Sequence, residues 1–147
     1  MRVLIQRVKK ASVEIDGKIV GKINMGILVF FATTHSDQKS QIPWFVNKIV
    51  NLRIFTDENG KLNLSLKDIK GEILIVSQFT LYGDCMQGRR PSFIKAQDPS
   101  VATKFYDAFV GECKKEIAVV ETGIFGAKMD VSLVNNGPVT FMIDAKE

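Results

Sequence analysis

Residues 73–81, Ile73-Leu74-Ile75-Val76-Ser77-Gln78-Phe79-Thr80-Leu81, decide the fold. The first four form an unbroken apolar run, which is typical of a buried strand. The run passes directly into a hydroxyl, an amide and a second hydroxyl, and burying such groups is costly unless something hydrogen-bonds them. A substrate is one candidate for that partner. We therefore predict a strand that continues to Leu81, and we expect the chemistry of the protein at its polar end.

Strand patterns dominate the chain before this stretch. Apolar positions in residues 3–8 and 13–15 predict strands, and Asp16-Gly17 suits a two-residue hairpin turn with Ile19 on the returning strand. The run Ile27–Phe31 is continuously apolar. Such continuity predicts a strand that is covered on both faces and is therefore central in its sheet.

Two helices are predicted, one on each side of residues 73–81. Apolar residues are spaced three and four apart from about Ser40 to Leu52, with Pro43 tolerated in the first turn. The second helix spans residues 99–116, where Val101, Phe105, Phe109 and Cys113 share one face.

The remaining segments are short strands and turns. Residues 53–55 are predicted as a strand and residues 57–60 as a turn, alternating leucines follow at 62, 64 and 66, and the chain returns to strands from Val119. The fold class is therefore mixed α/β and mainly antiparallel, a β-barrel-like sheet with two packed helices. At 147 residues we expect one domain over residues 1–147.

Composition excludes several classes of function. No apolar run approaches the ~18 residues of a membrane span, and the Met1 end reads as a strand, so a cytoplasmic protein is expected. Two cysteines, Cys85 and Cys113, argue against a disulfide framework or a thiol-rich metal site. Scattered carboxylates and the absence of phosphate-loop and dinucleotide motifs predict neither metal nor cofactor. The net charge of +4 modestly favours a polyanionic partner such as RNA.

Nucleophilic catalysis also has few candidate residues. The single histidine, His35, lies in a polar stretch that reads as a solvated loop, so a histidine-activated nucleophile could be built only around it. Thr80 by itself is a β-branched residue that simply suits a strand.

A second motif, Asn135-Asn136-Gly137-Pro138-Val139-Thr140, lies between strand patterns. The bond before a proline is the kind most tolerant of the cis form, and it can aim backbone carbonyls in a fixed direction. The segment Ser77–Gly83 and this second motif resemble the two motifs of the D-aminoacyl-tRNA deacylases. Residues 1–8, 88–93 and 123–129 are similar to the same family, so the resemblance covers nearly the whole chain in matching order.

The resemblance implies a homodimeric editing enzyme that hydrolyses the ester between a D-amino acid and the terminal adenosine of tRNA. Glycyl-tRNA is an expected second substrate, and no DNA or membrane partner is expected. The resemblance also implies that the chain has the fold of this family. The resemblance further implies that the Gly137-Pro138 bond is cis and enters the partner subunit's site, where its carbonyls are expected to leave no room for the side chain of an L-amino acid.

The resemblance also assigns roles to residues. It implies that the catalytic pocket is formed by Ser77, Gln78, Phe79 and Thr80. It further implies that Phe125 and Met129 flank the amino acid and adenine, that Ala102 contacts the adenine, and that Arg7 braces the segment containing Asn136, Gly137 and Pro138.

A threonine nucleophile needs a neighbouring base, and the sequence offers none. We therefore expect catalysis assisted by the RNA itself: the vicinal hydroxyl of the terminal ribose lies beside the ester, and backbone N–H groups near Phe79 and Thr80 stabilise the oxyanion. Thr80 then positions the substrate and does not attack it.

The basic residues Arg89, Arg90 and Lys95, with Lys9 and Lys10, either contact tRNA phosphates or form a solvated face. Two alternative functions remain. One is a non-enzymatic RNA-binding module, although its stacking aromatics would have to be exposed, and the Phe and Trp positions read mainly as buried. The other is a related deacylase of relaxed chirality, for which altered motif residues and a trans Gly-Pro bond are expected.

Overall fold

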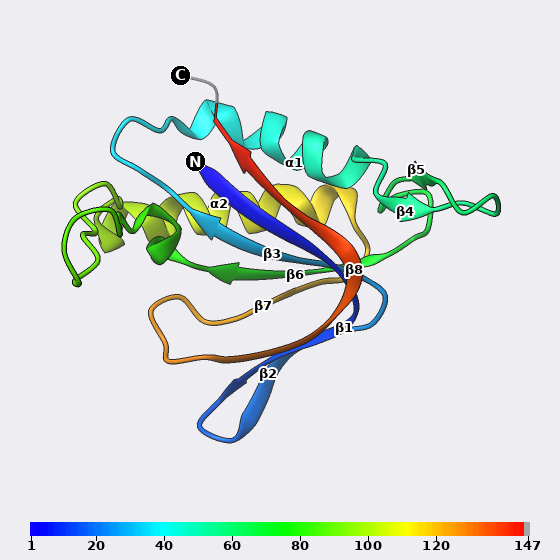
Figure 1. Ribbon diagram of the computed structural model, residues 1–147, viewed down its shortest axis with the longest axis horizontal. Coiled ribbons are helices and arrows are strands. Elements are labelled where there is room, and N and C mark those ends of the chain that lie inside the picture. Colours follow the sequence, from blue (N-terminus) through cyan, green and yellow to red (C-terminus); the bar gives the residue numbers. More distant parts are fainter. Residues whose placement is uncertain (146–147) are drawn as a thin grey trace.

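A computed structural model of the chain describes residues 1–145, and its centre is a six-stranded mixed sheet (Figure 1). The strands are β1 (Arg2–Ile15), β2 (Lys18–Ile23), β3 (Gly26–Ala32), β6 (Glu72–Ser77), β7 (Val120–Thr122) and β8 (Asp130–Asp144). Their order is β2-β1-β3-β6-β7, and β8 also pairs with β1. Every pairing of β1 is antiparallel, whereas β3–β6 and β6–β7 are parallel. The predicted mixed α/β class is confirmed.

The long strand β1 organises the sheet by pairing with three others. Its first half pairs with β3, its second half pairs with β2, and β8 follows it along both halves. At the far end β2 approaches β7 so closely that a Cβ at Gly21 would lie 2.4 Å from the carbonyl oxygen of Thr122. Only glycine permits this approach, which nearly closes the sheet into a barrel.

Both faces of the central strands are covered. The helices α1 (Ile42–Asn51) and α2 (Pro99–Glu116) lie side by side over one face (Figure 1), where Ile73 and Ile75 pack with Phe45 and Phe109. Leu74 and Val76 point to the other face and form a second core inside the curl of the sheet. The predictions of buried central strands at residues 27–31 and 73–76 are confirmed.

The predicted strand over residues 73–81 is wrong beyond Ser77. The backbone N–H of Gln78 still donates to the carbonyl oxygen of Phe31 at 2.8 Å, but β3 ends one residue later, so no strand remains to pair with. The chain instead turns into the 3-10 helix η2 (Phe79–Tyr82). Thr80 therefore lies on a tight turn and not on a strand.

Smaller differences concern the ends of elements. A 3-10 turn, η1 (Lys39–Gln41), precedes α1, so the first helix begins at Ile42. The short strand expected at residues 53–55 is β4 (Phe55–Thr56), paired with β5 (Leu62–Leu64). Gly137-Pro138 lies within one strand, β8, and does not separate two strands. No helix in residues 1–145 is both long and apolar enough to span a membrane.

One buried polar group gives a stability prediction. Thr33 is 3% exposed, and within residues 1–145 its hydroxyl has no hydrogen-bond partner. Thr33→Val keeps the shape and removes the unpaired hydroxyl, so we expect unfolding to cost about 1 kcal/mol more and the Tm to rise by about 2–4 °C. Thr34→Val is the matched control: its hydroxyl donates to the carbonyl oxygen of Lys95, so this change is expected to destabilise. If both variants lost the same free energy of unfolding, the Thr33 hydroxyl could not be an unpaired group.

The two cysteines are predicted to differ in reactivity. Cys85 is exposed, whereas Cys113 is buried, and burial raises the pKa of the Cys113 thiol to about 12. Only a thiolate reacts rapidly with disulfide reagents. At pH 8 we expect a disulfide reagent to label one thiol in the folded protein and two after denaturation, with the fast phase absent in Cys85→Ser. Rapid labelling of Cys85→Ser would show that Cys113 becomes accessible.

Candidate active site

A cavity of about 590 Å³ lies where β6 ends, beside the start of α2 and the segment before β8. It brings together six residues that the sequence singled out: Ser77, Gln78, Phe79, Ala102, Phe125 and Met129. These residues come from three distant parts of the chain. The cavity also has members that sequence reasoning missed, among them Phe93, Gln97 and Asp98. Only the resemblance at residues 88–93 pointed to any of them.

The turn η2 places Phe79 in the lining of this cavity, whereas Thr80, the next residue of the turn, does not line it. The side-chain amide of Gln78 donates to the Thr80 hydroxyl. Phe79 and Thr80 are the first residues of η2, so their backbone N–H groups have no acceptor within the turn. Such groups can donate to an anionic oxygen. The geometry therefore offers oxyanion donors next to a hydroxyl that is already held in place.

No general base lies against Thr80 among residues 1–145. Its hydrogen-bond partner is the neutral amide of Gln78, and the one histidine is used elsewhere: Nε2 of His35 lies 3.0 Å from the carbonyl oxygen of Ile94. Residues 1–145 also contain no group of three potential metal ligands. The arrangement is suited to positioning and to oxyanion stabilisation.

Arg2 fixes the far end of η2. Its Nη1 donates to the carbonyl oxygen of Leu81 at 2.8 Å, and its Nε donates to Oδ1 of Asp144 at 2.7 Å. The guanidinium also lies 4.9 Å from the centre of the Tyr82 ring, and the hydrogen bond to Asp144 raises the pKa of Arg2. The turn that carries Phe79 and Thr80 is thus tied to β1 and β8.

Two aromatic rings stand at the cavity. Phe79 and Phe93 meet edge to face with ring centres 5.1 Å apart, and they are 57% and 39% exposed. The expectation that the Phe and Trp residues are mainly buried is wrong for this pair, because both lie on loop or turn backbone, and it is also wrong for Trp44 and Phe141, which are exposed. Exposed rings can stack on a nucleotide base.

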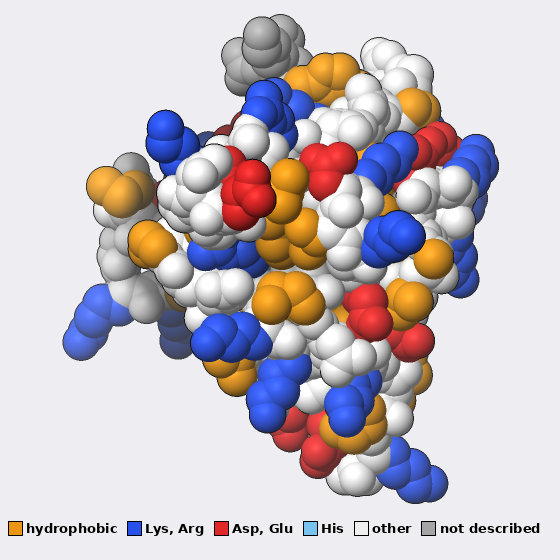
Figure 2. Space-filling model, turned by 90° about the vertical axis from the view of Figure 1, so that its right-hand side faces the viewer, with side chains coloured by type: hydrophobic (Ala, Val, Ile, Leu, Met, Phe, Trp, Pro, Cys, Tyr) orange, Lys and Arg blue, Asp and Glu red, His pale blue; other side chains and the backbone are white. Residues whose placement is uncertain are grey.

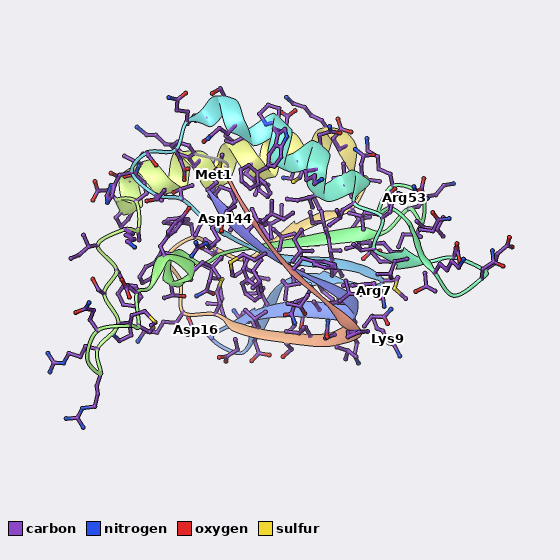
Figure 3. All side chains as sticks on the ribbon, turned by 45° about the horizontal axis from the view of Figure 1, so that its top comes forward. Met1, Arg7, Lys9, Asp16, Arg53 and Asp144 are labelled. Atoms are coloured by element: carbon purple, nitrogen blue, oxygen red, sulfur yellow. The ribbon has the colours of Figure 1, made fainter. Side chains whose placement is uncertain are left out.

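The basic loop before α2 projects from the same end of the molecule. Arg89 and Arg90 are exposed, and Figure 3 shows this loop extending at the left, away from the sheet. A bridge between Asp84 and Ser92 closes the loop. Lys95 is exposed as well, and its carbonyl oxygen accepts from Thr34. The three predicted RNA contacts thus lie in one segment that adjoins the cavity.

Arg7 holds the second motif by several hydrogen bonds. It is 5% exposed, and its guanidinium donates to the carbonyl oxygens of Asn136 at 2.9 Å, Gly137 at 3.4 Å and Ile54 at 2.7 Å. The Gly137-Pro138 peptide is cis. The side chain of Asn135 closes the segment by donating to the carbonyl oxygens of Arg7 and Val139.

This second motif bulges from the sheet. Gln6 pairs with Thr140 and Val8 pairs with Asn135, so residues 136–139 stand opposite the single residue Arg7. The extra residues have no place in the ladder, so the strand bends there: Gly137 and Pro138 are exposed, whereas Val139 points into the core and is 2% exposed. We call the segment Asn136–Val139 the Gly-Pro bulge.

The Gly-Pro bulge does not reach the cavity of its own chain. Arg7 is level with Ile73 across the sheet, whereas the lining of the cavity begins on β6 at Val76, and three strand spacings separate β8 from β6. At ~3.3 Å per residue and ~4.8 Å per strand, the separation is on the order of 20 Å. Figure 1 shows the bend of β8 at the opposite end from the loop before α2.

Comparison with known proteins gives a consistent result. The family model described as D-Tyr-tRNA(Tyr) deacylase matches residues 4–144. The chain is 58% identical to a D-aminoacyl-tRNA deacylase of Thermosipho africanus and 55% identical to one of Clostridium acetobutylicum. Each match covers 100% of this chain and 99% of the relative.

Solved structures also resemble the fold, and two of them illustrate this. One, named c-Myc DNA Unwinding Element Binding Protein, has a TM-score of 0.94 at 37% identity, with both chains covered completely. The other, described as a probable eukaryotic D-amino acid tRNA deacylase, has a TM-score of 0.85 at 21% identity over 98% of both chains, which shows the fold alone. The family model and the full-length relatives show that the chain belongs to the D-Tyr-tRNA(Tyr) deacylase family.

Proposed function

We propose that this protein hydrolyses the ester bond of D-aminoacyl-tRNA in the cytoplasm as a homodimer, in which the cavity of one subunit receives the Gly-Pro bulge of the other. Family membership supports the hydrolase activity and the tRNA substrate. The observation that supports the finer proposal is the separation of the two motifs: the cavity and the Gly-Pro bulge lie at opposite ends of one chain, so a site that uses both motifs needs the bulge of a second copy.

The Gly-Pro bulge is suited to such an insertion. It protrudes from the sheet, and its backbone is fixed by the guanidinium of Arg7 and by the side chain of Asn135. Rigid carbonyl oxygens facing the α-carbon of the substrate can accept from its ammonium group while excluding an L side chain. Chirality is then read without contact to the D side chain. Because glycine has no side chain to exclude, glycyl-tRNA is a second substrate.

The cavity supplies the remaining contacts of the proposed site. Phe125 and Met129 flank the amino acid and the adenine, Ala102 contacts the adenine, and the exposed Phe79–Phe93 pair provides a stacking surface at the edge. Arg89, Arg90 and Lys95 lie in the adjoining loop, where they contact phosphates of the RNA. The binding free energy should therefore depend strongly on salt concentration.

Catalysis in this proposal relies on the substrate's own ribose. Water adds to the ester carbonyl, the backbone N–H groups of Phe79 and Thr80 donate to the oxyanion, and the ribose oxygen leaves with a proton, giving the free D-amino acid and tRNA. The vicinal ribose hydroxyl assists by hydrogen bonding to the reacting oxygens. Thr80 positions the substrate through its hydroxyl and does not become acylated.

The test of this mechanism combines one variant with one altered substrate. Thr80→Ala should retain activity within about tenfold of the unchanged protein, because it removes a positioning contact and no nucleophile. A D-aminoacyl-tRNA whose terminal adenosine lacks the vicinal hydroxyl should instead be cleaved at least about 100-fold more slowly. Two results together would contradict RNA-assisted catalysis and indicate attack by Thr80. One is complete loss of activity in a Thr80→Ala protein that still folds and binds tRNA, and the other is rapid cleavage of the substrate that lacks the vicinal hydroxyl.

A second candidate function is nucleic-acid binding without hydrolysis. It is favoured by the basic loop beside an exposed aromatic pair, and one solved structure of similar fold is named c-Myc DNA Unwinding Element Binding Protein. It predicts binding of uncharged tRNA or duplex DNA by a protein that leaves both D- and L-aminoacyl esters intact. If the protein is instead a related deacylase of relaxed chirality, it should cleave L-alanyl-tRNA.

A further inference from the structure

Two lysines lie directly beside the Gly-Pro bulge. Val8 pairs with Asn135 and Lys10 pairs with Val134, so Lys9 is itself an extra residue that bulges from β1. Lys9 and Lys10 are exposed, and neither forms an ion pair within residues 1–145. Figure 3 labels Lys9 next to Arg7 at the end of the molecule where β1 and β8 bend. Wherever the Gly-Pro bulge is inserted, these two ammonium groups accompany it.

The surface around the lysines continues the positive charge. Lys10 borders a hollow of about 350 Å³ on the outer face of β1, β2 and β8, where Ser12 lies between Lys22 of β2 and Ser132 of β8. Ammonium and hydroxyl groups are the usual donors to phosphate oxygens. Figure 2 looks onto this end and shows Lys and Arg side chains spread over its lower part, with hydrophobic and uncharged groups and a few Asp and Glu side chains between them.

We propose that Lys9 and Lys10 contact the phosphates of the tRNA bound in the partner subunit, so that each RNA is held by basic residues of both subunits. This inference rests on the proposed dimer and adds a trans contact to it. Arg89, Arg90 and Lys95 adjoin the cavity of their own chain, whereas Lys9 and Lys10 do not line that cavity and lie next to the segment that enters the other one.

The first test separates RNA contact from chemistry. Replacing both lysines, Lys9→Gln with Lys10→Gln, should weaken the binding of uncharged tRNA about 10- to 30-fold at 0.15 M salt and reduce the slope of log K against log salt by about 1.4–1.8. Hydrolysis of D-aminoacyl-adenosine, which has no phosphate, should be unchanged. The control, Lys48→Gln with Lys114→Gln, makes the same charge change on α1 and α2 and should leave both measurements unchanged.

The second test assigns the contact to the partner. In mixed dimers, Ala102→Phe in one subunit fills its cavity and leaves only the other cavity open. If the two Lys→Gln changes are in the Ala102→Phe subunit, the open cavity should bind D-aminoacyl-tRNA weakly, with a raised KM. If they are in the subunit with the open cavity, the KM should equal that of the dimer with unchanged lysines.

The opposite pattern, or an equal effect in both mixed dimers, would overturn the trans assignment. Loss of D-aminoacyl-adenosine hydrolysis in the Lys→Gln protein would also overturn it, because the lysines would then shape the site and not bind RNA. Failure of the proposed function gives a different result: the unchanged protein would cleave no D-aminoacyl-tRNA, while its tRNA binding would still respond to the lysines.

Discussion

Arg7→Lys is expected to weaken both the fold and the preference for D-amino acids. The guanidinium donates to three carbonyl oxygens on two segments, and a lysine ammonium cannot reach all of them with the same geometry. Because buried carbonyls would lose charged donors, we expect the free energy of unfolding to fall by about 2–3 kcal/mol. The Gly-Pro bulge would lose its fixed position, so hydrolysis of D-aminoacyl-tRNA should fall at least about tenfold, and the ratio of D to L cleavage should narrow.

The matched control for this prediction is Arg53→Lys. Arg53 also donates to a backbone carbonyl, that of Asn63 at 2.8 Å, but it is exposed, and within residues 1–145 it forms no hydrogen bond with the Gly-Pro bulge. Urea unfolding and single-turnover hydrolysis of D- and L-tyrosyl-tRNA measure both effects. An Arg7→Lys protein with unchanged chiral preference would show that Arg7 supports the fold without positioning the proposed selectivity segment.

Ala102→Phe is expected to abolish hydrolysis while leaving the fold intact. Ala102 lines the cavity near the start of α2, together with Phe125 and Met129, so a benzyl group there occupies the space proposed for adenosine. We expect kcat/KM for D-aminoacyl-tRNA to fall at least about 100-fold. The Tm should change little, because the added ring enters a space that is already open.

Val101→Phe controls for a larger residue on the same turn of the helix. Val101 is exposed and does not line the cavity, so this variant should keep its activity. If Ala102→Phe cleaved the D ester as fast as Val101→Phe, the substrate would have to bind outside this cavity.

The sequence predicted those parts of the fold that depend on neighbouring residues, and it missed those that depend on segments distant in the chain. Ile73 to Val76 are apolar at every position, and the structure buries alternate residues in two different cores, as continuity of the run predicts. The turn at Phe79 was missed because it depends on where β3 ends, and residues 73–81 carry no information about a neighbouring strand.

The functional site was likewise predicted where the sequence carries a signal for it and missed where it does not. The resemblance drew attention to Ser77, Gln78, Ala102 and Met129, and these residues do line one cavity. Phe93 was missed as a cavity residue because loop backbone has no periodicity that reveals which side chains face inward. The anchoring of Arg7 to the carbonyl oxygen of Ile54 could not be predicted either, since a backbone acceptor leaves no signature in the sequence.

The decisive experiment compares the hydrolysis rates of D-tyrosyl-tRNA and L-tyrosyl-tRNA by the purified, chelator-treated protein. The proposed function predicts rapid cleavage of the D ester while the L ester persists as long as it does in buffer. Comparable cleavage of both esters would contradict selection by the Gly-Pro bulge. Cleavage of neither, with tRNA still bound, would contradict the hydrolase and leave a nucleic-acid-binding protein.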